Sequence, residues 1–403
     1  MHPEIAKRLI AKYASDSKKV VFDPFMGSGG VLVEALLHGN NSVGIDVNPF
    51  AVLLSKVKTT TILPAKLQKT FDEILAKSQS DYTKKIRYDN APKTMNLSFW
   101  YKLDVSYKLS ILKHYIFELD TAKTIQDFFK VCFSLTSRKA SNQRNGIYKI
   151  YRKNKEKLDK FNPDVFEIFK DVCSKNIEKM SSFSSSIKQQ TQAFPLLGDT
   201  RNIAKAFSRV PERIFDDEKV HLVVTSPPYG DHRTTVAYGQ FSKHPGLWLD
   251  LPKEELLDVD SVGLGGTKKK EITDLHSPLL DKILQDVEKK DKEISKKTNN
   301  PSRAADVFAY FYDLDLCLEQ TSKFLKPAQS HCCFVVANRT VRRIKIPTDQ
   351  IIVELGKKYG LKHKDTIYRT IANKAMSVKN APENIADFAG DTMTKESIVI
   401  WEY

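Results

Sequence analysis

Short apolar runs alternate with helical patterns near the start of the chain. The run VVFDPF at 20–25 is followed by a glycine-rich turn, a helical pattern at 31–39 and a second apolar run, SVGIDVN, at 42–48. Another helical pattern, PFAVLLSKVK, covers 49–58. Because parallel strands need a crossover helix between them, this alternation predicts the first half of a parallel α/β unit.

The same alternation returns in the second half of the chain, where apolar runs predict strands and a 3.6-residue period predicts helices. The predicted helices cover about 304–324 and 349–359. The apolar runs are FPLLGDT at 194–200, HLVVT at 221–225, HCCFVVAN at 331–338, DTIYRTI at 365–371 and SIVIWEY at 397–403. We therefore expect 1–60 and 193–403 to be the two halves of one α/β domain.

The pattern between these halves is different. Lysine-rich helical stretches with aromatic residues, such as IQDFFKVCFSL at 125–135, replace the strands, and a serine-rich segment ends the region at 181–192. These features predict an inserted helical domain at 61–192. From about 230 to 300 the chain is polar and irregular, which predicts a mobile loop region.

Composition limits the class of protein. Of the 403 residues, 41% are hydrophobic and 28% are charged, which is typical of a globular protein. The 64 lysines and arginines exceed the 49 acidic residues, and this excess fits a phosphate-binding surface as well as an ordinary solvated one. Five cysteines without a CxxC pair favour a reducing cytoplasm and predict no metal site. No apolar run is long enough to predict a membrane span.

The turn DPFMGSGG at 23–30 has the features of a cofactor site. Gly27 and Gly29 lie where a nucleotide-like cofactor would approach a bare backbone, beside the start of a helix. Asp46 follows Gly27 by 19 residues at the end of the next predicted strand, where an acidic side chain can accept both ribose hydroxyls. A tight strand-to-helix connection is the alternative explanation of the glycines.

The segment TSPPYG at 225–230 has the features of a catalytic site. The segment resembles the catalytic motif of amino-methyltransferases, which methylate an exocyclic base amine. Such an amine is a poor nucleophile, so the enzyme must accept its hydrogens. The hydroxyl of Ser226 and the carbonyl of Pro227 can do so, and Tyr229 can stack on a flipped-out base. A proline turn that only closes a strand is the alternative, but the cofactor-like turn in the same chain favours the catalytic interpretation.

These motifs resemble those of a known family. DPFMGSGG with GIDVNP resembles the cofactor motif of S-adenosylmethionine-dependent amino-methyltransferases, and TSPPYG resembles their catalytic motif. The resemblance covers His2 to Lys58 and Leu196 to Tyr403. A serine before the two prolines resembles the DNA cytosine-N4 enzymes, and TSPPYGDHRTTVAYGQFS looks like a bacterial restriction-modification methylase.

The resemblance implies a Rossmann-like methyltransferase fold with a mixed sheet, S-adenosylmethionine as cofactor and double-stranded DNA with a flipped base as substrate. It also implies a companion restriction endonuclease. The implied catalytic residues are Ser226, Pro227, Pro228 and Tyr229. The implied cofactor-binding residues are Asp23, Phe25, Gly27, Gly29, Asp46, Asp199 and Thr225.

Two of these implications have alternatives. Asp199 matches the acidic residue near the adenine ring of the cofactor, but the residue types around it suit a helix N-cap equally well. In the family, an aromatic residue that covers the methionine end of the cofactor precedes the segment that His2 to Ile5 resembles. Either the pocket is incomplete, or another residue or chain closes it.

Basic and aromatic side chains at three places are candidates for contacts with nucleic acid. One group lies in SLTSRKASNQR at 134–144, where some related DNA methylases carry a target-recognition domain. A second group follows the catalytic motif and includes Trp248. A third group lies near the predicted C-terminal strands. The candidates are Arg138, Lys139, Arg144, Arg233, Tyr238, Arg339, Arg342 and Arg369.

The leading hypothesis is therefore a DNA cytosine-N4 methyltransferase. Adenine N6 in DNA and guanine N2 in RNA are alternative acceptors, since DPFMGSGG with VLVEA also resembles RNA guanine-N2 enzymes. A catalytically silent nucleic-acid-binding subunit is an alternative of a different class. The recognition sequence and the oligomeric state are left open.

Overall fold

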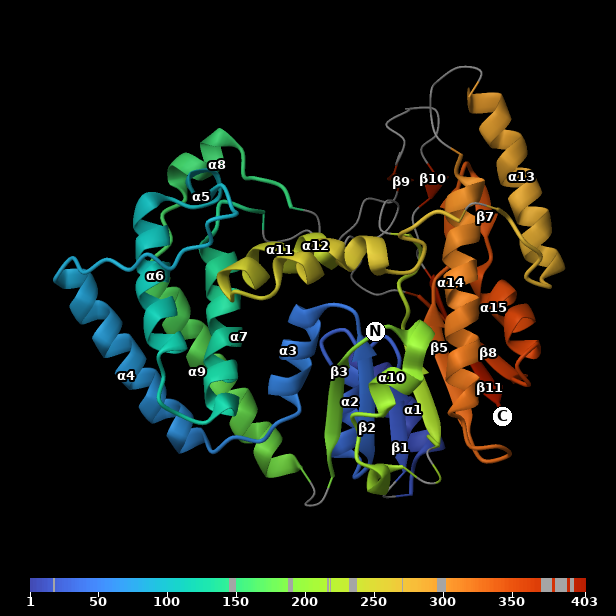
Figure 1. Ribbon diagram of the computed structural model, residues 1–403, viewed down its shortest axis with the longest axis horizontal. Helices are drawn as coiled ribbons and strands as arrows, with labels where there is room; N and C mark the ends of the chain where they lie inside the picture. The colour runs from blue at the N-terminus through green and yellow to red at the C-terminus, as the bar shows by residue number, and fades with distance from the viewer. Residues whose placement is uncertain are drawn as a thin grey trace. The chain divides into compact units, whose positions relative to one another are not determined.

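The computed structural model describes residues 1–16, 19–144, 150–187, 191–215, 217, 219–231, 238–269, 271–295, 302–370, 379–380, 390–391 and 395–403. The chain divides into two compact units, coloured along the sequence in Figure 1. The α/β unit consists of Met1–Val47, Gln190–Val236 and Asp260–Tyr403. The helical unit consists of Asn48–Gln189 and Ala237–Val259.

A seven-stranded sheet organises the described part of the α/β unit, in the order β3-β2-β1-β4-β5-β11-β8. The first five strands are parallel, and β11 lies antiparallel between β5 and β8. The strands are β1 (Val20–Asp23), β2 (Asn41–Asp46), β3 (Ala193–Leu197), β4 (Leu222–Thr225), β5 (His331–Val336), β8 (Lys362–Thr370) and β11 (Lys395–Glu402). This doubly wound order places a switch point between β1 and β4, and it confirms the predicted Rossmann-like mixed sheet.

Helices cover both faces of the sheet, because successive strand side chains point to opposite faces and both sets are apolar. Phe22 and Phe334 belong to one buried cluster with residues of α10, α14 and α15. Val21 and Val335 are also fully buried and face the opposite side, where α1 and α2 contact the sheet. These helices are α1 (Pro3–Tyr13), α2 (Gly30–Leu37), α10 (Ile203–Phe207), α14 (Ala304–Lys323) and α15 (Thr348–Lys357).

Shorter elements complete the described part of this unit. Two 3-10 turns, η1 (Thr200–Asn202) and η2 (Glu212–Ile214), flank α10. Two small antiparallel pairs lie outside the main sheet. They are β6 (Arg339–Val341) with β7 (Ile344–Ile346), and β9 (Lys379–Asn380) with β10 (Gly390–Asp391).

Helix α13 (Pro278–Ser295) lies where the polar sequence predicts an irregular chain. Leu280, Ile283, Leu284 and Val287 recur at helical spacing and are all buried. Most other positions of the helix are lysine, aspartate or glutamate, so the segment as a whole is polar and its apolar period is easily overlooked. The prediction of an irregular chain is therefore wrong here, and also for α11 (Tyr238–Trp248) and α12 (Lys253–Val262).

The helical unit has four long helices that pack on one another, α4 (Pro64–Thr83), α6 (Leu103–Phe117), α7 (Lys123–Ala140) and α9 (Val165–Ser186), as Figure 1 shows. Phenylalanines from these helices, including Phe71, Phe129 and Phe169, are buried in its core. The shorter helices are α3 (Pro49–Lys58), α5 (Leu97–Trp100) and α8 (Lys155–Lys160). Both α3 and α11 belong to this unit, although they lie outside the predicted 61–192.

Trp248 at the end of α11 is part of the helical core. Its side chain is fully buried, and its ring packs edge-on against Tyr101 and Phe133, with centroid distances of 5.7 and 5.8 Å. The prediction that Trp248 belongs to a loop that holds the target strand is therefore wrong. Among the helices of the described residues, none is both long and apolar enough to cross a membrane.

Candidate active site

The glycine-rich turn begins where β1 ends, at the carboxyl edge of the sheet. Gly27 and Gly29 have φ angles of 50° and 76°, a conformation that favours glycine, and Gly29 is the N-cap of α2. A Cβ atom built on Gly27 would meet no atom of the described residues within 4 Å, so these residues leave open space beside the turn. The Gly27 amide donates to Oδ2 of Asp46 at 2.9 Å, which fixes the end of β2 against the turn. A bare backbone beside a half-buried carboxylate fits a nucleoside-containing cofactor.

Asp23 connects this turn to the catalytic motif. Thr225, the last residue of β4, donates its hydroxyl to Oδ1 of Asp23 at 2.6 Å, and the Phe25 amide donates to the same oxygen at 3.1 Å. Asp23 is only 3% exposed, and burial raises the pKa of its carboxyl to about 7. Both predicted motifs therefore meet at adjacent strands, across a hydrogen bond between Thr225 and Asp23.

The catalytic motif follows β4 directly, with Ser226, Pro228 and Tyr229 partly exposed. The Ser226 hydroxyl donates to the Tyr229 hydroxyl at 3.3 Å, and Tyr229 donates to Oε1 of Glu396 at 2.9 Å. Arg369 on β8 lies 3.3 Å from Oε2 of Glu396 on β11. Arg369, a predicted DNA contact, therefore pairs with a carboxylate beside the motif. Glu396 is absent from the residues predicted by sequence.

Two buried side chains, Tyr310 and Arg339, hold the C-terminal end of the catalytic motif. Tyr310 of α14 donates its hydroxyl to the carbonyl oxygen of Pro228 at 2.7 Å. The guanidinium of Arg339 lies 5.1 Å from the centre of the Tyr310 ring and donates to Asp231 at 2.6 Å. A Cβ atom on Gly230 would collide with Arg339, so the close approach of this arginine requires glycine.

Arg339 and Arg342 are buried, which corrects their prediction as phosphate contacts. Each is only 4% exposed as a residue, and Arg342 donates to Asp291 at 2.8 Å. Their acidic partners, Asp231 and Asp291, lie 108 and 51 residues away in sequence. In the sequence, the basic residues after β5 have no acidic partners beside them, because these carboxylates belong to other segments of the chain. Guanidinium groups that are buried and ion-paired in this way do not present a surface to DNA phosphates.

Asp199 caps a short turn after β3. Its carboxylate accepts from the Arg201 amide at 2.9 Å and pairs with the Arg201 guanidinium at 2.6 Å, so the N-cap interpretation is confirmed. Arg201 also reaches the buried Asp313 at 3.2 Å. A role of Asp199 beside the cofactor stays a prediction. Phe25 packs against the sheet core and is partly buried.

The candidate DNA contacts of the helical unit divide into paired and exposed side chains. Arg138 stacks on Phe241 at 3.7 Å, and Lys139 lies 3.3 Å from Asp171, whereas the side chain of Arg144 is exposed. The serines and threonines of 134–144 are buried, and four of their hydroxyls donate to carbonyls of their own helix, so they do not present a polar loop. Tyr238 is 48% exposed at the start of α11. Arg233 lies outside the described residues.

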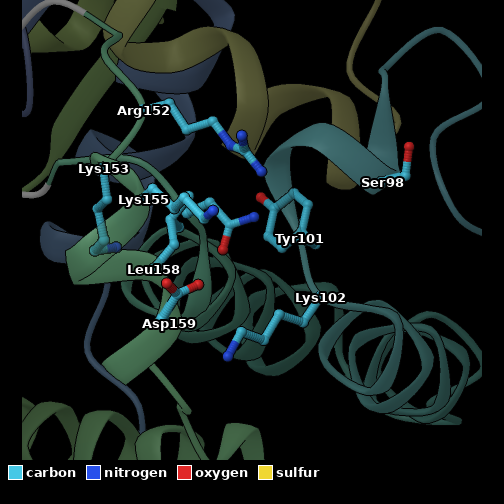
Figure 2. Close-up of a pocket in the computed structure, with 9 residues that line it drawn as sticks. Ser98, Tyr101, Lys102, Arg152, Lys153, Lys155, Leu158 and Asp159 are labelled. Atoms are coloured by element: carbon cyan, nitrogen blue, oxygen red, sulfur yellow. The ribbon is translucent and has the colours of Figure 1, made fainter.

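The helical unit also holds a basic cavity of about 640 Å³, which no sequence motif indicated. Arg152 lies 4.4 Å over the ring of Phe99, and in Figure 2 its side chain points toward the Tyr101 hydroxyl. Lys153 is held inside by the carbonyls of Ser141 and Gln143. The residues that line the cavity are Ser98, Tyr101, Lys102, Asn142, Arg152, Lys153, Lys155, Leu158 and Asp159.

The fold and the site together define a Rossmann-like methyltransferase, in which a glycine turn and a proline motif share the carboxyl edge of a mixed sheet. Comparison with known proteins identifies the family within this class. A family model for N6/N4 DNA methylases matches residues 2–57. The chain is 37% identical to the type II methyltransferase M.MvaI of Kocuria varians over 99% of this chain and 88% of that protein.

Two further similarities were found. The type II methyltransferase M.MjaII of Methanocaldococcus jannaschii is 31% identical over 38% of this chain and 26% of its own length. The rRNA methyltransferase aviRa from Streptomyces viridochromogenes aligns with a TM-score of 0.30 and 10% identity, over 100% of this chain and 85% of aviRa. A structural similarity of this size adds nothing to the assignment.

The chain belongs to the N6/N4 DNA methylase family, as a type II DNA methyltransferase of restriction-modification. The resemblance noted from the sequence motifs is thereby confirmed. Membership of this family implies S-adenosylmethionine as the methyl donor and DNA as the substrate.

Proposed function

We propose that this protein transfers a methyl group from S-adenosylmethionine to the exocyclic N4 of a cytosine flipped out of double-stranded DNA. The observation that supports it most is the hydrogen bond between Thr225 and Asp23 at 2.6 Å. This bond fixes the serine-proline motif beside the open glycine turn, where a bound donor would lie.

The residues of the glycine turn suit the donor. Open space at Gly27 leaves room for the cofactor to contact the backbone, and Asp46 offers a carboxylate to ribose hydroxyls. Asp23, Phe25, Gly29, Asp199 and Thr225 complete the proposed cofactor-binding set. When bound, the donor supplies an electrophilic methyl group attached to a sulfonium.

The residues of the catalytic motif act on the base amine. Ser226 and the carbonyl of Pro227 accept its two hydrogens, which favours the tetrahedral nitrogen that forms during transfer. Tyr229 stacks on the base, and Pro228 is held by Tyr310. The serine at 226 favours cytosine over adenine through the family resemblance. The geometry by itself supports an exocyclic amine of either base.

The helical unit would hold the DNA backbone. Lys102, Arg152 and Lys155 outnumber the one carboxylate, Asp159, in the lining of its cavity. These three cations would contact phosphate oxygens of the DNA backbone. Arg138, Lys139, Arg144 and Tyr238 are further candidates on the same unit.

The acceptor base can be identified directly. The purified protein is incubated with radiolabelled S-adenosylmethionine and plasmid DNA, and the DNA is digested to nucleosides. We expect label on N4-methylcytosine. Label on N6-methyladenine would overturn the choice of base, and label on RNA alone would overturn the substrate class. Cofactor binding by a folded protein that methylates nothing would indicate a silent subunit.

The role of the cavity has a separate test. Replacing Lys102, Arg152 and Lys155 by alanine, one at a time, should lower the slope of log affinity against log salt by about 1 each. Lys160→Ala is a matched control, since Lys160 lies on α8 and pairs with Glu156. Fluorescence anisotropy with a labelled DNA duplex, repeated over a range of salt concentrations, measures the slope for each variant and for the control. An unchanged slope in all three variants would remove the cavity from the DNA-binding surface.

We also propose that a companion restriction endonuclease cuts the unmethylated site. DNA methylated by this protein should then resist that nuclease.

A further inference from the structure

The hydrogen bonds that begin at Ser226 end in a carboxylate on another strand. Ser226 donates to Tyr229 at 3.3 Å, Tyr229 donates to Glu396 at 2.9 Å, and Glu396 lies 3.3 Å from Arg369. We propose that Glu396 is a positioning residue that fixes the direction of this chain, so that Ser226 presents lone pairs to the base amine. This inference rests on the proposed function.

The direction matters because a serine hydroxyl has one hydrogen and can either donate or accept toward a given neighbour. If Ser226 pointed its hydrogen at the base, it would meet the amine hydrogens and could not accept them. An ionised carboxylate has no hydrogen to give and only accepts. Glu396 therefore draws the Tyr229 hydrogen, which leaves the Tyr229 oxygen to accept from Ser226. The free lone pairs of Ser226 then face the substrate side.

The structure holds Glu396 in place through the sheet and through Arg369. Glu396 and Arg369 are direct partners in the antiparallel register of β11 and β8, so the ion pair is set by the sheet. The Glu396 side chain is 12% exposed, and the Arg369 side chain is 29% exposed. A partly buried pair of this kind is weakened less by solvent than a surface pair.

The same chain accounts for the proton that the reaction releases. The amine nitrogen forms a bond to the methyl carbon, the carbon–sulfur bond breaks, and its electron pair stays on sulfur. The nitrogen then loses one proton to Ser226, which passes its own to Tyr229, and Tyr229 passes its own to Glu396. Glu396 ends the cycle protonated and returns the proton to solvent.

Glu396→Gln tests this role, because a glutamine amide nearly preserves the shape but can donate as well as accept. We expect kcat to fall about 10-fold or more, with the KM for DNA and the Kd for cofactor unchanged. Tyr229→Phe breaks the chain at its middle. In the double variant, Glu396→Gln should lower kcat no further than Tyr229→Phe alone.

Glu402→Gln is the matched control, since Glu402 lies at the other end of β11 and pairs with Lys364. Its kcat should equal that of the parent protein, and thermal unfolding should show all variants folded. The proposal is overturned if Glu396→Gln leaves kcat unchanged, if it alters only KM, or if the two substitutions multiply in the double variant. A parent protein that methylates no DNA would instead refute the proposed function.

Discussion

Asp23 is a carboxylic acid in an almost water-free position, and this has a consequence for stability. Burial raises the pKa of Asp23 from 3.8 to about 7, so at intermediate pH the folded protein holds a proton that the unfolded chain has released. A proton bound only by the folded state stabilises it. That stability is fully present below about pH 4 and is lost as the pH rises toward 7.

The prediction concerns the Asp23→Asn variant, which cannot titrate. Between pH 4 and 7 the free energy of unfolding of the parent protein should fall relative to that of the variant, by up to about 1.4 kcal/mol per pH unit. Urea unfolding of both proteins across this range measures the difference. Parallel pH profiles would show that the Asp23 carboxyl is ionised throughout.

Tyr310 gives a second prediction at this scale. Tyr310→Phe removes the hydroxyl that holds the Pro228 carbonyl, while the ring beneath Arg339 stays. Stability should fall by about 1 kcal/mol. The value of kcat should fall several-fold, because the catalytic motif loses the hydrogen bond that holds the Pro228 carbonyl. Tyr312→Phe, two residues along α14, should change neither. Equal kcat in the two variants would contradict a bracing role.

Single residues also show what sequence can and cannot predict. Ser226 to Tyr229 form a local pattern, two prolines after an apolar run, which needs no knowledge of the fold. Glu396 lies 167 residues beyond Tyr229 and belongs to no motif. Its contact exists only because β11 inserts between β5 and β8. For the same reason, sequence could not show that Asp231 and Asp291 neutralise two of the predicted DNA-binding arginines.

At the scale of elements, α13 depends on one apolar stripe. Leu280 is 1% exposed within the main core cluster. Leu280→Ala should destabilise the protein by about 2–5 kcal/mol, through lost burial and the cavity that remains. Lys289→Ala on the exposed side of the same helix should have little effect. Chemical unfolding compares them, and equal midpoints would mean that α13 is not packed as described.

Elements were predictable where a single period dominates the sequence. The parallel strands read as short apolar runs because both of their faces are buried. Helix α11 was hidden because Gly239, Pro245 and Gly246 are unfavourable inside a helix. Helices α12 and α13 were hidden because charged residues fill their exposed faces and leave only one apolar position in three or four. In these two helices the mixed composition reflects a single narrow row of buried apolar side chains.

At the scale of the whole molecule, the formal charge of +15 predicts a strong effect of salt. If binding neutralises about six phosphates, DNA affinity should fall about 10³-fold between 50 and 200 mM salt. The affinity for the cofactor should change far less, because its site is built from backbone, a carboxylate and short polar groups. Titrations of each ligand at both salt concentrations measure this. A similar loss for both would indicate that salt acts on folding.

The helical unit is assembled from two separate stretches of chain, Asn48–Gln189 and Ala237–Val259. The second stretch supplies Trp248 and Leu256 to the core of the first. A recombination event, natural or engineered, that exchanged only the longer stretch between two such methylases would bring together cores that had not evolved to match. Transplanting the helical unit as a module therefore requires a paired exchange on both sides of the catalytic motif.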